Sequence, residues 1–172
     1  MSKVGTLLLS NGRKLPLLGL GTWQASDEKQ LDVALRTALD IVVEEYIKNG
    51  KFKREDIYIT SKLPTHGHKN TEIFIERSLE RLRTNYIDLN LIHAPMQYLC
   101  NPETKEPKED AEGKRIVDLV PFNETWKVFE KFYDEGKLKA IGISNFNQKQ
   151  IQKVYDQARI KPHNLEFQLS QN

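Results

Sequence analysis

Five side chains that could contact a polar ligand stand where short apolar runs of the sequence end. In chain order they are Trp23, Lys62, His93, Ser144 and Asn145. The lysine brings a positive charge, the histidine, serine and asparagine exchange hydrogen bonds, and the tryptophan offers an apolar wall. If the runs are parallel strands of a (β/α) barrel, their carboxyl ends meet at one face, where such barrels hold their active sites. The spacing therefore predicts a site on that face.

Each of these residues also has a purely structural interpretation. A histidine in the position of His93, between apolar neighbours, is compatible with a core residue, as is Trp23. Lys62 is compatible with an ion pair at the rim. Ser144 and Asn145 are residue types that open a turn by hydrogen-bonding to the backbone. Their shared position at the ends of strands favours the functional interpretation.

Alternating apolar runs and amphipathic segments predict the elements that must position this site. Expected strands are 17–23, 57–63, 87–93, 138–144 and 165–169, and expected helices are 28–49, 72–82, a segment from Asn123 to Gly136, and a segment beginning at Asn147. Asn11-Gly12 between two extended runs predicts an N-terminal hairpin. Strands that alternate with helices predict an α/β fold with a parallel sheet. Since no G-x-G-x-x-G follows a strand, we expect an incomplete (β/α)8 TIM barrel of about five strands plus the hairpin.

Length, charge and cysteine content argue against several classes of protein. The 172 residues predict a single domain, 1–172, and a net charge of +2 gives no general attraction to nucleic acid or membrane. No apolar stretch is long enough for a transmembrane helix or a signal peptide, and the lone Cys100 cannot form an internal disulfide, so we expect a cytoplasmic protein. Cys100 itself is expected to be an exposed loop thiol. His66 and His68 lie in a polar loop without a third ligand, so no metal is expected.

A long connection over residues 94–121 lacks helical or strand periodicity and is rich in Pro, Lys and Glu. Loops of this length in compact domains are usually functional or disordered. We expect a mobile loop at the mouth of the site, and Tyr98 within it to line a substrate pocket.

Several motifs together resemble the aldo-keto reductases. They are GLGTW (19–23), TSKLP (60–64), NYIDL (85–89), LIHAP (91–95) and GISNF (142–146), and the similarity runs from about residue 5 to residue 168. The resemblance implies a complete (β/α)8 barrel that binds NADP(H) across its rim and reduces aldehydes or ketones to alcohols. It also implies four catalytic groups: a Tyr that acts as the acid, a Lys, an Asp that holds this Lys, and a His that orients the carbonyl.

Matching the motifs residue by residue assigns roles to positions of this chain. By resemblance, Lys62 and His93 are the catalytic Lys and His. The positions that resemble cofactor or pocket residues are Thr22, Trp23, Ser144, Asn145 and Glu166. Among these, Glu166 stands where the family has a Gln, and a carboxylate has no amide donor for the nicotinamide.

The chain departs from the family at its centre and at its end. Asp40 runs directly into Ile41, where the family has the strand that carries its Asp and its Tyr, which accounts for the uninterrupted helical pattern over 28–49. Tyr46 belongs to the apolar face of that helix, and Tyr98 is a slightly better substitute acid. The sequence ends at Asn172, before the last two strands and the loop that binds the adenosine 2′-phosphate, so we expect weakened NADP(H) binding.

These departures leave three hypotheses. The first is an internally deleted and truncated reductase, from a splice variant or an incomplete gene model, that is catalytically impaired. The second is a non-catalytic, reductase-like interaction protein that associates through open sheet edges. The third is a complete reductase that uses Tyr98 as its acid. The preference for NADPH over NADH rests on the resemblance alone.

Overall fold

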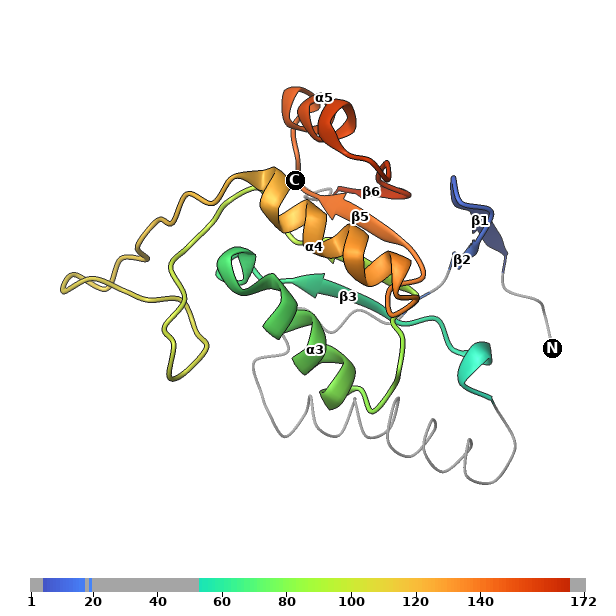
Figure 1. The fold of residues 1–172 in the computed structure, drawn as a ribbon, viewed down its shortest axis with the longest axis horizontal. Helices are drawn as coiled ribbons and strands as arrows, with labels where there is room; N and C mark the ends of the chain where they lie inside the picture. Colours follow the sequence, from blue (N-terminus) through green and yellow to red (C-terminus); the bar gives the residue numbers. More distant parts are fainter. Residues whose placement is uncertain (1–4, 18, 20–52, 168–172) are drawn as a thin grey trace, which may run out of the picture. The chain divides into compact units, whose positions relative to one another are not determined.

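A four-stranded parallel sheet is the centre of the structure, a computed structural model that describes residues 5–17, 19 and 53–167 (Figure 1). Its strands, in spatial order, are β3 (Thr60–Leu63), β4 (Leu89–Ile92), β5 (Ile141–Ser144) and β6 (Asn164–Glu166). They confirm four of the five expected barrel strands. The remaining strand, 17–23, lies almost wholly outside the described residues, as do Thr22, Trp23 and the expected helix 28–49.

The expected hairpin is present. Strands β1 (Thr6–Leu8) and β2 (Lys14–Pro16) pair antiparallel, and Gly12 supplies the positive φ of +79° that the turn requires. At the tip of the hairpin, the Asn11 side-chain amide donates to the Lys139 carbonyl over 3.1 Å. That hydrogen bond ties the turn to the segment that leads into β5.

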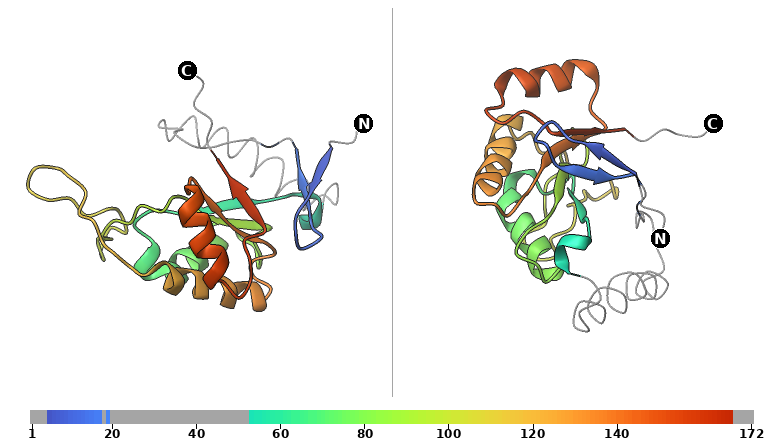
Figure 2. Two further views of the ribbon diagram at one scale, coloured as in Figure 1. Left: turned by 90° about the horizontal axis from the view of Figure 1, so that it is seen from above. Right: turned by 90° about the vertical axis from the view of Figure 1, so that its right-hand side faces the viewer.

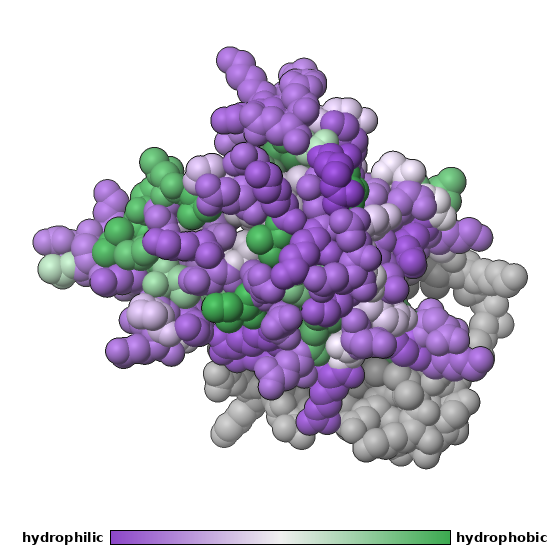
Figure 3. All heavy atoms as spheres, in the orientation of Figure 1, coloured by the Kyte–Doolittle hydropathy of each residue, from purple (hydrophilic) through white to green (hydrophobic). Residues whose placement is uncertain are grey.

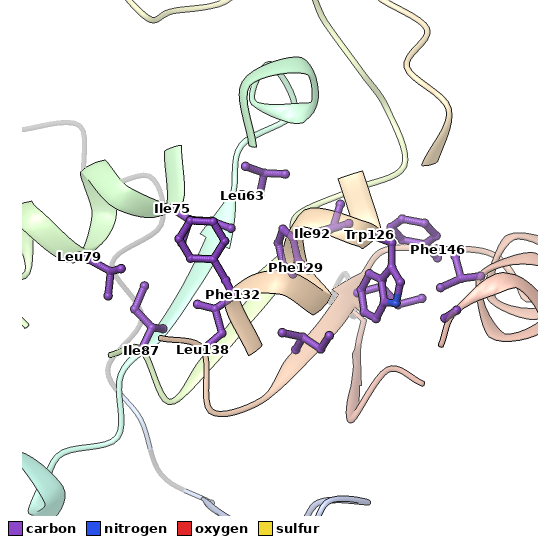
Figure 4. Packing of buried hydrophobic residues seen from close by; sticks show 14 residues of the cluster. Leu63, Ile75, Leu79, Ile87, Ile92, Trp126, Phe129, Phe132, Leu138 and Phe146 are labelled. Atoms are coloured by element: carbon purple, nitrogen blue, oxygen red, sulfur yellow. The ribbon is translucent and has the colours of Figure 1, made fainter. Parts of the chain in front are cut away.

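Three helices, α3 (Thr71–Arg81), α4 (Phe122–Asp134) and α5 (Gln148–Gln157), cover one face of the sheet (Figure 2). Short 3-10 helices, η2 (Arg54–Asp56) and η3 (His68–Asn70), precede β3 and α3. Helix α4 fills the centre of the core, because Phe129 and Phe132 have no exposed surface and Phe129 stacks on Trp126 with 5.8 Å between ring centroids (Figure 4).

The strands contribute alternate residues to this core. Leu63, Ile92, Ile141 and Ile143 pack against the helices. Because successive side chains of a strand point to opposite faces, the residues between them point away from the helices. Residues that alternate with these apolar side chains therefore lie on the opposite face of the sheet, away from the helices.

Helix caps agree with the sequence in one case and differ in another. Asn147 caps α5 and forms a capping box with Gln150, as its position predicts. Helix α4 begins earlier than expected: Pro121 is its N-cap residue, and Asn123 lies inside the first turn. The predicted Asn123 cap is wrong because Pro121, at φ −55°, already directs the chain into the helix. The helix ends as expected at Gly136, which has a φ of +71°.

Replacing Asn147 by Ala is expected to lower the free energy of unfolding by about 1 kcal/mol, since the α5 amides lose their side-chain acceptor. Asn123→Ala is the matched control and should change it by less than about 0.5 kcal/mol, because exposed Asn123 caps nothing. Urea denaturation measures both. Equal losses for the two variants would contradict the assignment of the caps.

The long connection 94–121 folds back on itself instead of running as a featureless loop. Isolated antiparallel bridges pair Tyr98 with Val117, Cys100 with Pro107 and Glu109 with Arg115. Figure 1 shows the connection in yellow, projecting beyond the carboxyl ends of the strands. Its mobility stays a prediction.

Two side chains of this connection differ in exposure from what its polar composition suggests. Cys100 was expected to be exposed, but it is buried, with Sγ 3.4 Å from the Asn101 carbonyl oxygen, because the bridge to Pro107 folds the chain over it. Leu119, in contrast, is 86% exposed, and hydrophobic residues gather on this side of the molecule (Figure 3).

Candidate active site

Four polar side chains share one face at the carboxyl ends of the strands. The parallel register sets Lys62 beside Leu91, and Leu91 beside Gly142. Ser144 is two residues beyond Gly142 on β5 and lies beside Glu166 of β6. His93 comes two residues after Leu91, so it continues the same face. Lys62, His93, Ser144 and Glu166 therefore all lie opposite the helices.

An ion pair joins the two outer strands of the sheet. Lys62 Nζ on β3 donates to Glu166 Oε1 on β6, although 104 residues separate them in the sequence. About a third of each side chain is exposed, 34% for Lys62 and 39% for Glu166. The positive charge of Lys62 is therefore held by a carboxylate while it remains within reach of solvent.

Asn145 forms hydrogen bonds with residues at the ends of three strands. Its side-chain amide donates to the His93 carbonyl and to Ser144 Oγ, each over 3.0 Å, and its backbone N–H donates to the Glu166 carbonyl over 2.9 Å. Its φ of +61° lies in the left-handed region, which asparagine tolerates better than most residues. Asn145 thus fixes the positions of His93, Ser144 and Glu166 relative to one another.

Burial and charge make the His93 imidazole neutral near pH 7. The pKa of His93 lies below its ordinary 6.5, first because the ring is partly buried and then because the Lys62 cation disfavours a second positive charge. The Glu166 carboxylate opposes this by raising the pKa of His93. A neutral imidazole keeps one N–H donor, which can bind an oxygen atom of a ligand.

Most of the sequence-predicted site residues that the structure describes come together here. Lys62, His93, Ser144, Asn145 and Glu166 form the cluster. Tyr98 does not join it through any contact among the described residues: its hydroxyl lies 3.9 Å from Met96 Sδ, and its ring lies under the Arg115 guanidinium. Both contacts are internal to the connection 94–121.

Two interactions of the structure have no clear signal in the sequence. The Lys62–Glu166 pair bridges strands that are not neighbours, so neither spacing nor motif indicates it; only the opposite charges at two rim positions could have suggested it. His68 is expected in a polar loop, but its side chain is buried, at 4% exposed, with Nδ1 3.1 Å from Thr125 Oγ1. Desolvation lowers the pKa of His68 to about 4.

Two grooves of about 520 Å³ each lie on the helix side and are separate from this cluster. One lies between the starts of α3 and α4, beside His68 and Leu119. The other runs between α4 and α5, along Trp126 and Val154. Neither is lined by Lys62 or His93, so neither is the candidate site.

Two structural features were not found in the part of the chain that the structure describes. No three His, Cys, Asp or Glu side chains gather there as a metal site. No helix there is long and apolar enough to cross a membrane.

Comparison with known proteins places the chain in a family. The sequence profile of the Aldo/keto reductase family matches residues 36–171. An uncharacterized oxidoreductase of Schizosaccharomyces pombe is 36% identical over 92% of this chain and 54% of its own length. The NAD(P)H-dependent D-xylose reductase of Kluyveromyces lactis is 35% identical over 95% of this chain and 58% of its own.

Solved structures agree with this match. The aldose reductase of Schistosoma japonicum superposes with a TM-score of 0.85 at 35% identity, over 96% of this chain and 61% of that one. The fold is thus the α/β fold of aldose reductase, a TIM barrel, over part of its length. The chain spans little more than half the length of the curated relatives it matches. On sequence and structure together, this chain belongs to the aldo/keto reductase family.

Proposed function

We propose that this chain carries the cofactor- and carbonyl-binding half of an NADP(H)-dependent reductase site, and that the chain alone does not turn over. The convergence of Lys62, His93, Ser144 and Glu166 on one face carries the proposal. The names of its relatives, which include a D-xylose reductase, support an aldehyde or ketone as the substrate class.

The side chains on β5 and β6 fit the carboxamide of a nicotinamide. A carboxamide has an acceptor oxygen and two N–H donors, so it needs partners of both kinds. The Ser144 hydroxyl can donate, whereas the Asn145 amide oxygen and the Glu166 carboxylate can accept, since both N–H groups of the Asn145 side chain already donate to the His93 carbonyl and to Ser144 Oγ. Ser144 is 1% exposed and its Oγ accepts from Asn145, so it lies behind the half-buried Asn145 and Glu166. These three residues would hold the carboxamide, and the bound NADP(H) would supply a hydride.

His93 and Lys62 would act on the carbonyl oxygen of the substrate. The neutral His93 ring can donate an N–H to that oxygen and so orient the carbonyl. The Lys62 cation would favour the negative charge that the oxygen gains as the carbonyl carbon accepts hydride.

Protonation of that oxygen is the missing step. The sequence lacks the position that carries the Tyr in the family, and the hydroxyl of the substitute Tyr98 lies 3.9 Å from Met96 Sδ. A general acid contributes about 10²–10⁴-fold to such reactions, so we expect its absence to suppress turnover. The alternative of an interaction protein that associates through sheet edges has no specific contact in its favour within the described ranges.

Fluorescence titration with NADPH tests the binding part of this proposal. Saturable binding is expected, and Ser144→Ala should weaken it about tenfold, since a buried hydrogen-bonding partner is lost. Ser78→Ala is the matched control, because the Ser78 hydroxyl donates to the Phe74 carbonyl within α3, on the helix side of the sheet, and it should leave the affinity unchanged. No binding up to millimolar NADPH, or equal effects of the two variants, would overturn the assignment.

Absorbance at 340 nm tests the catalytic part. With NADPH and 4-nitrobenzaldehyde, the chain is expected to oxidise NADPH no faster than buffer. Turnover that survives purification and disappears in His93→Ala would show that the chain is an active reductase. If Tyr98→Phe also abolished that turnover, Tyr98 would be its acid.

A further inference from the structure

The Lys62–Glu166 ion pair spans the whole width of the described sheet. Strands β4 and β5 lie between β3 and β6, so the two residues are three strand spacings apart, or about 14 Å in a flat sheet. A lysine and a glutamate side chain bridge that distance only when both reach inward over a curved sheet. The pair therefore crosses above the carboxyl ends of β4 and β5, where His93 and Ser144 lie.

Backbone contacts fix both ends of this bridge. Lys62 lies in register with Leu91, and the His93 N–H donates to the Leu63 carbonyl over 3.2 Å. Glu166 lies in register with Ser144, and its carbonyl accepts from Asn145 N–H. Because the backbone is fixed at both residues, the position of the flexible Lys62 ammonium group depends on the Glu166 carboxylate.

We propose that Glu166 is a positioning residue, whose carboxylate holds the Lys62 ammonium over the ends of β4 and β5. This positioning role rests on the proposed function, in which Lys62 and His93 are the groups that act on the substrate carbonyl. It adds the residue that holds Lys62 in place. Among the described residues, Glu166 is the carboxylate that pairs with Lys62. It does so in a chain whose sequence lacks the Asp that the family resemblance associates with this lysine. Glu166 would thus hold the catalytic Lys62 in addition to any contact with the cofactor.

His93 reports on this pair, because the two charges act on it in opposite directions. Lys62 lowers the pKa of His93 and Glu166 raises it, while burial lowers it further. Within the described part of the chain, these two are the charged groups that act on His93, one from β3 and one from β6. On β5, the neighbouring Ser144 and Asn145 are uncharged.

Titration of His93 by NMR, without any cofactor, tests the proposal. In Glu166→Gln the pKa of His93 should fall by about half a pH unit, since the raising charge is gone and Lys62 remains. In Lys62→Met it should rise by a similar amount. The Lys62 Nζ–H₃⁺ signal is expected to be visible at pH 6 in the unmodified chain, to broaden in Glu166→Gln and to be restored at least in part in Glu166→Asp.

Glu76→Gln is the matched control. It makes the same substitution in another ion pair, with Lys137 Nζ 3.4 Å from Glu76 Oε1 on the helix side of the molecule, so the titration of His93 should not change. Unaltered His93 and Lys62 signals in Glu166→Gln would overturn the positioning role. If Glu166→Gln fails to fold, Glu166→Asp and Lys62→Met decide the matter by the same readouts. NADPH binding is measured separately, so its absence would remove the proposed function and leave this pairing intact.

Discussion

Acidification from pH 7.5 to pH 4.5 is expected to reduce the free energy of unfolding by about 2–3 kcal/mol through His68 alone. In the folded state desolvation lowers the pKa of His68 to about 4, with the Ala94 backbone opposing the shift, whereas the unfolded chain titrates near 6.5. Between these values the unfolded state binds more protons, so stability rises with pH. The contribution is complete above pH 6.5 and is lost progressively as the pH falls towards 4.

Urea denaturation at several pH values isolates this contribution. A glutamine at position 68 does not titrate, so the stability of His68→Gln should fall less between pH 7.5 and pH 4.5 than that of the unmodified chain, by about 2–3 kcal/mol. His66→Gln serves as the control, since His66 is less buried and lies outside the core. Carboxylates titrate in all three proteins and cancel in the comparison. Parallel pH profiles for His68→Gln and the unmodified chain would contradict the burial of a neutral His68.

Truncation of Phe129 is expected to cause the largest loss of stability of any single change considered, about 3–5 kcal/mol for Phe129→Ala. The ring has no exposed surface, stacks on Trp126 and lies in the cluster that joins α4 to the sheet (Figure 4). Its removal costs the transfer free energy of the ring and leaves a cavity. The shift in the midpoint of urea denaturation measures the loss.

Two further variants make this result interpretable. Phe129→Leu retains most of the side-chain volume and should cost less than about 1.5 kcal/mol, so it gives a measurable value even where Phe129→Ala does not fold. Leu119→Ala, at a side chain that is 86% exposed, should change stability by less than about 0.5 kcal/mol. A loss at Leu119 as large as that at Phe129 would mean that the core extends into the connection 94–121.

Much of the described fold could be predicted because local patterns specify it. Alternating apolar residues identify β3 and β4, and the Asn11-Gly12 turn identifies the hairpin. Helix spacing and the Asn147 cap identify α5. The observed ends of some elements differ from the predicted ends by a few residues. At the start of α4, for example, the fixed φ of Pro121 begins the helix before the predicted Asn123 cap.

The site was predictable only in part. Lys62, His93, Ser144 and Asn145 could be named because each ends an expected strand, and parallel strands bring their carboxyl ends together. Glu166 could be named only through the resemblance to the family. The interactions could not be predicted, since the Lys62–Glu166 pair depends on how strongly the sheet curves, and the burial of His68 depends on packing against Thr125 of α4. Both join residues far apart in the sequence, for which no local pattern exists.

The hydrogen bond between Asn11 and the Lys139 carbonyl closes a loop of 128 residues. Closing such a loop in an unfolded chain costs about 4 kcal/mol of entropy, whereas one hydrogen bond returns about 1 kcal/mol. The bond can form only after β3, β4 and β5 have assembled and shortened the path between its ends. The contact between Asn11 and the Lys139 carbonyl thus depends on the sheet that brings its two ends together, and it should be lost before the sheet itself unfolds.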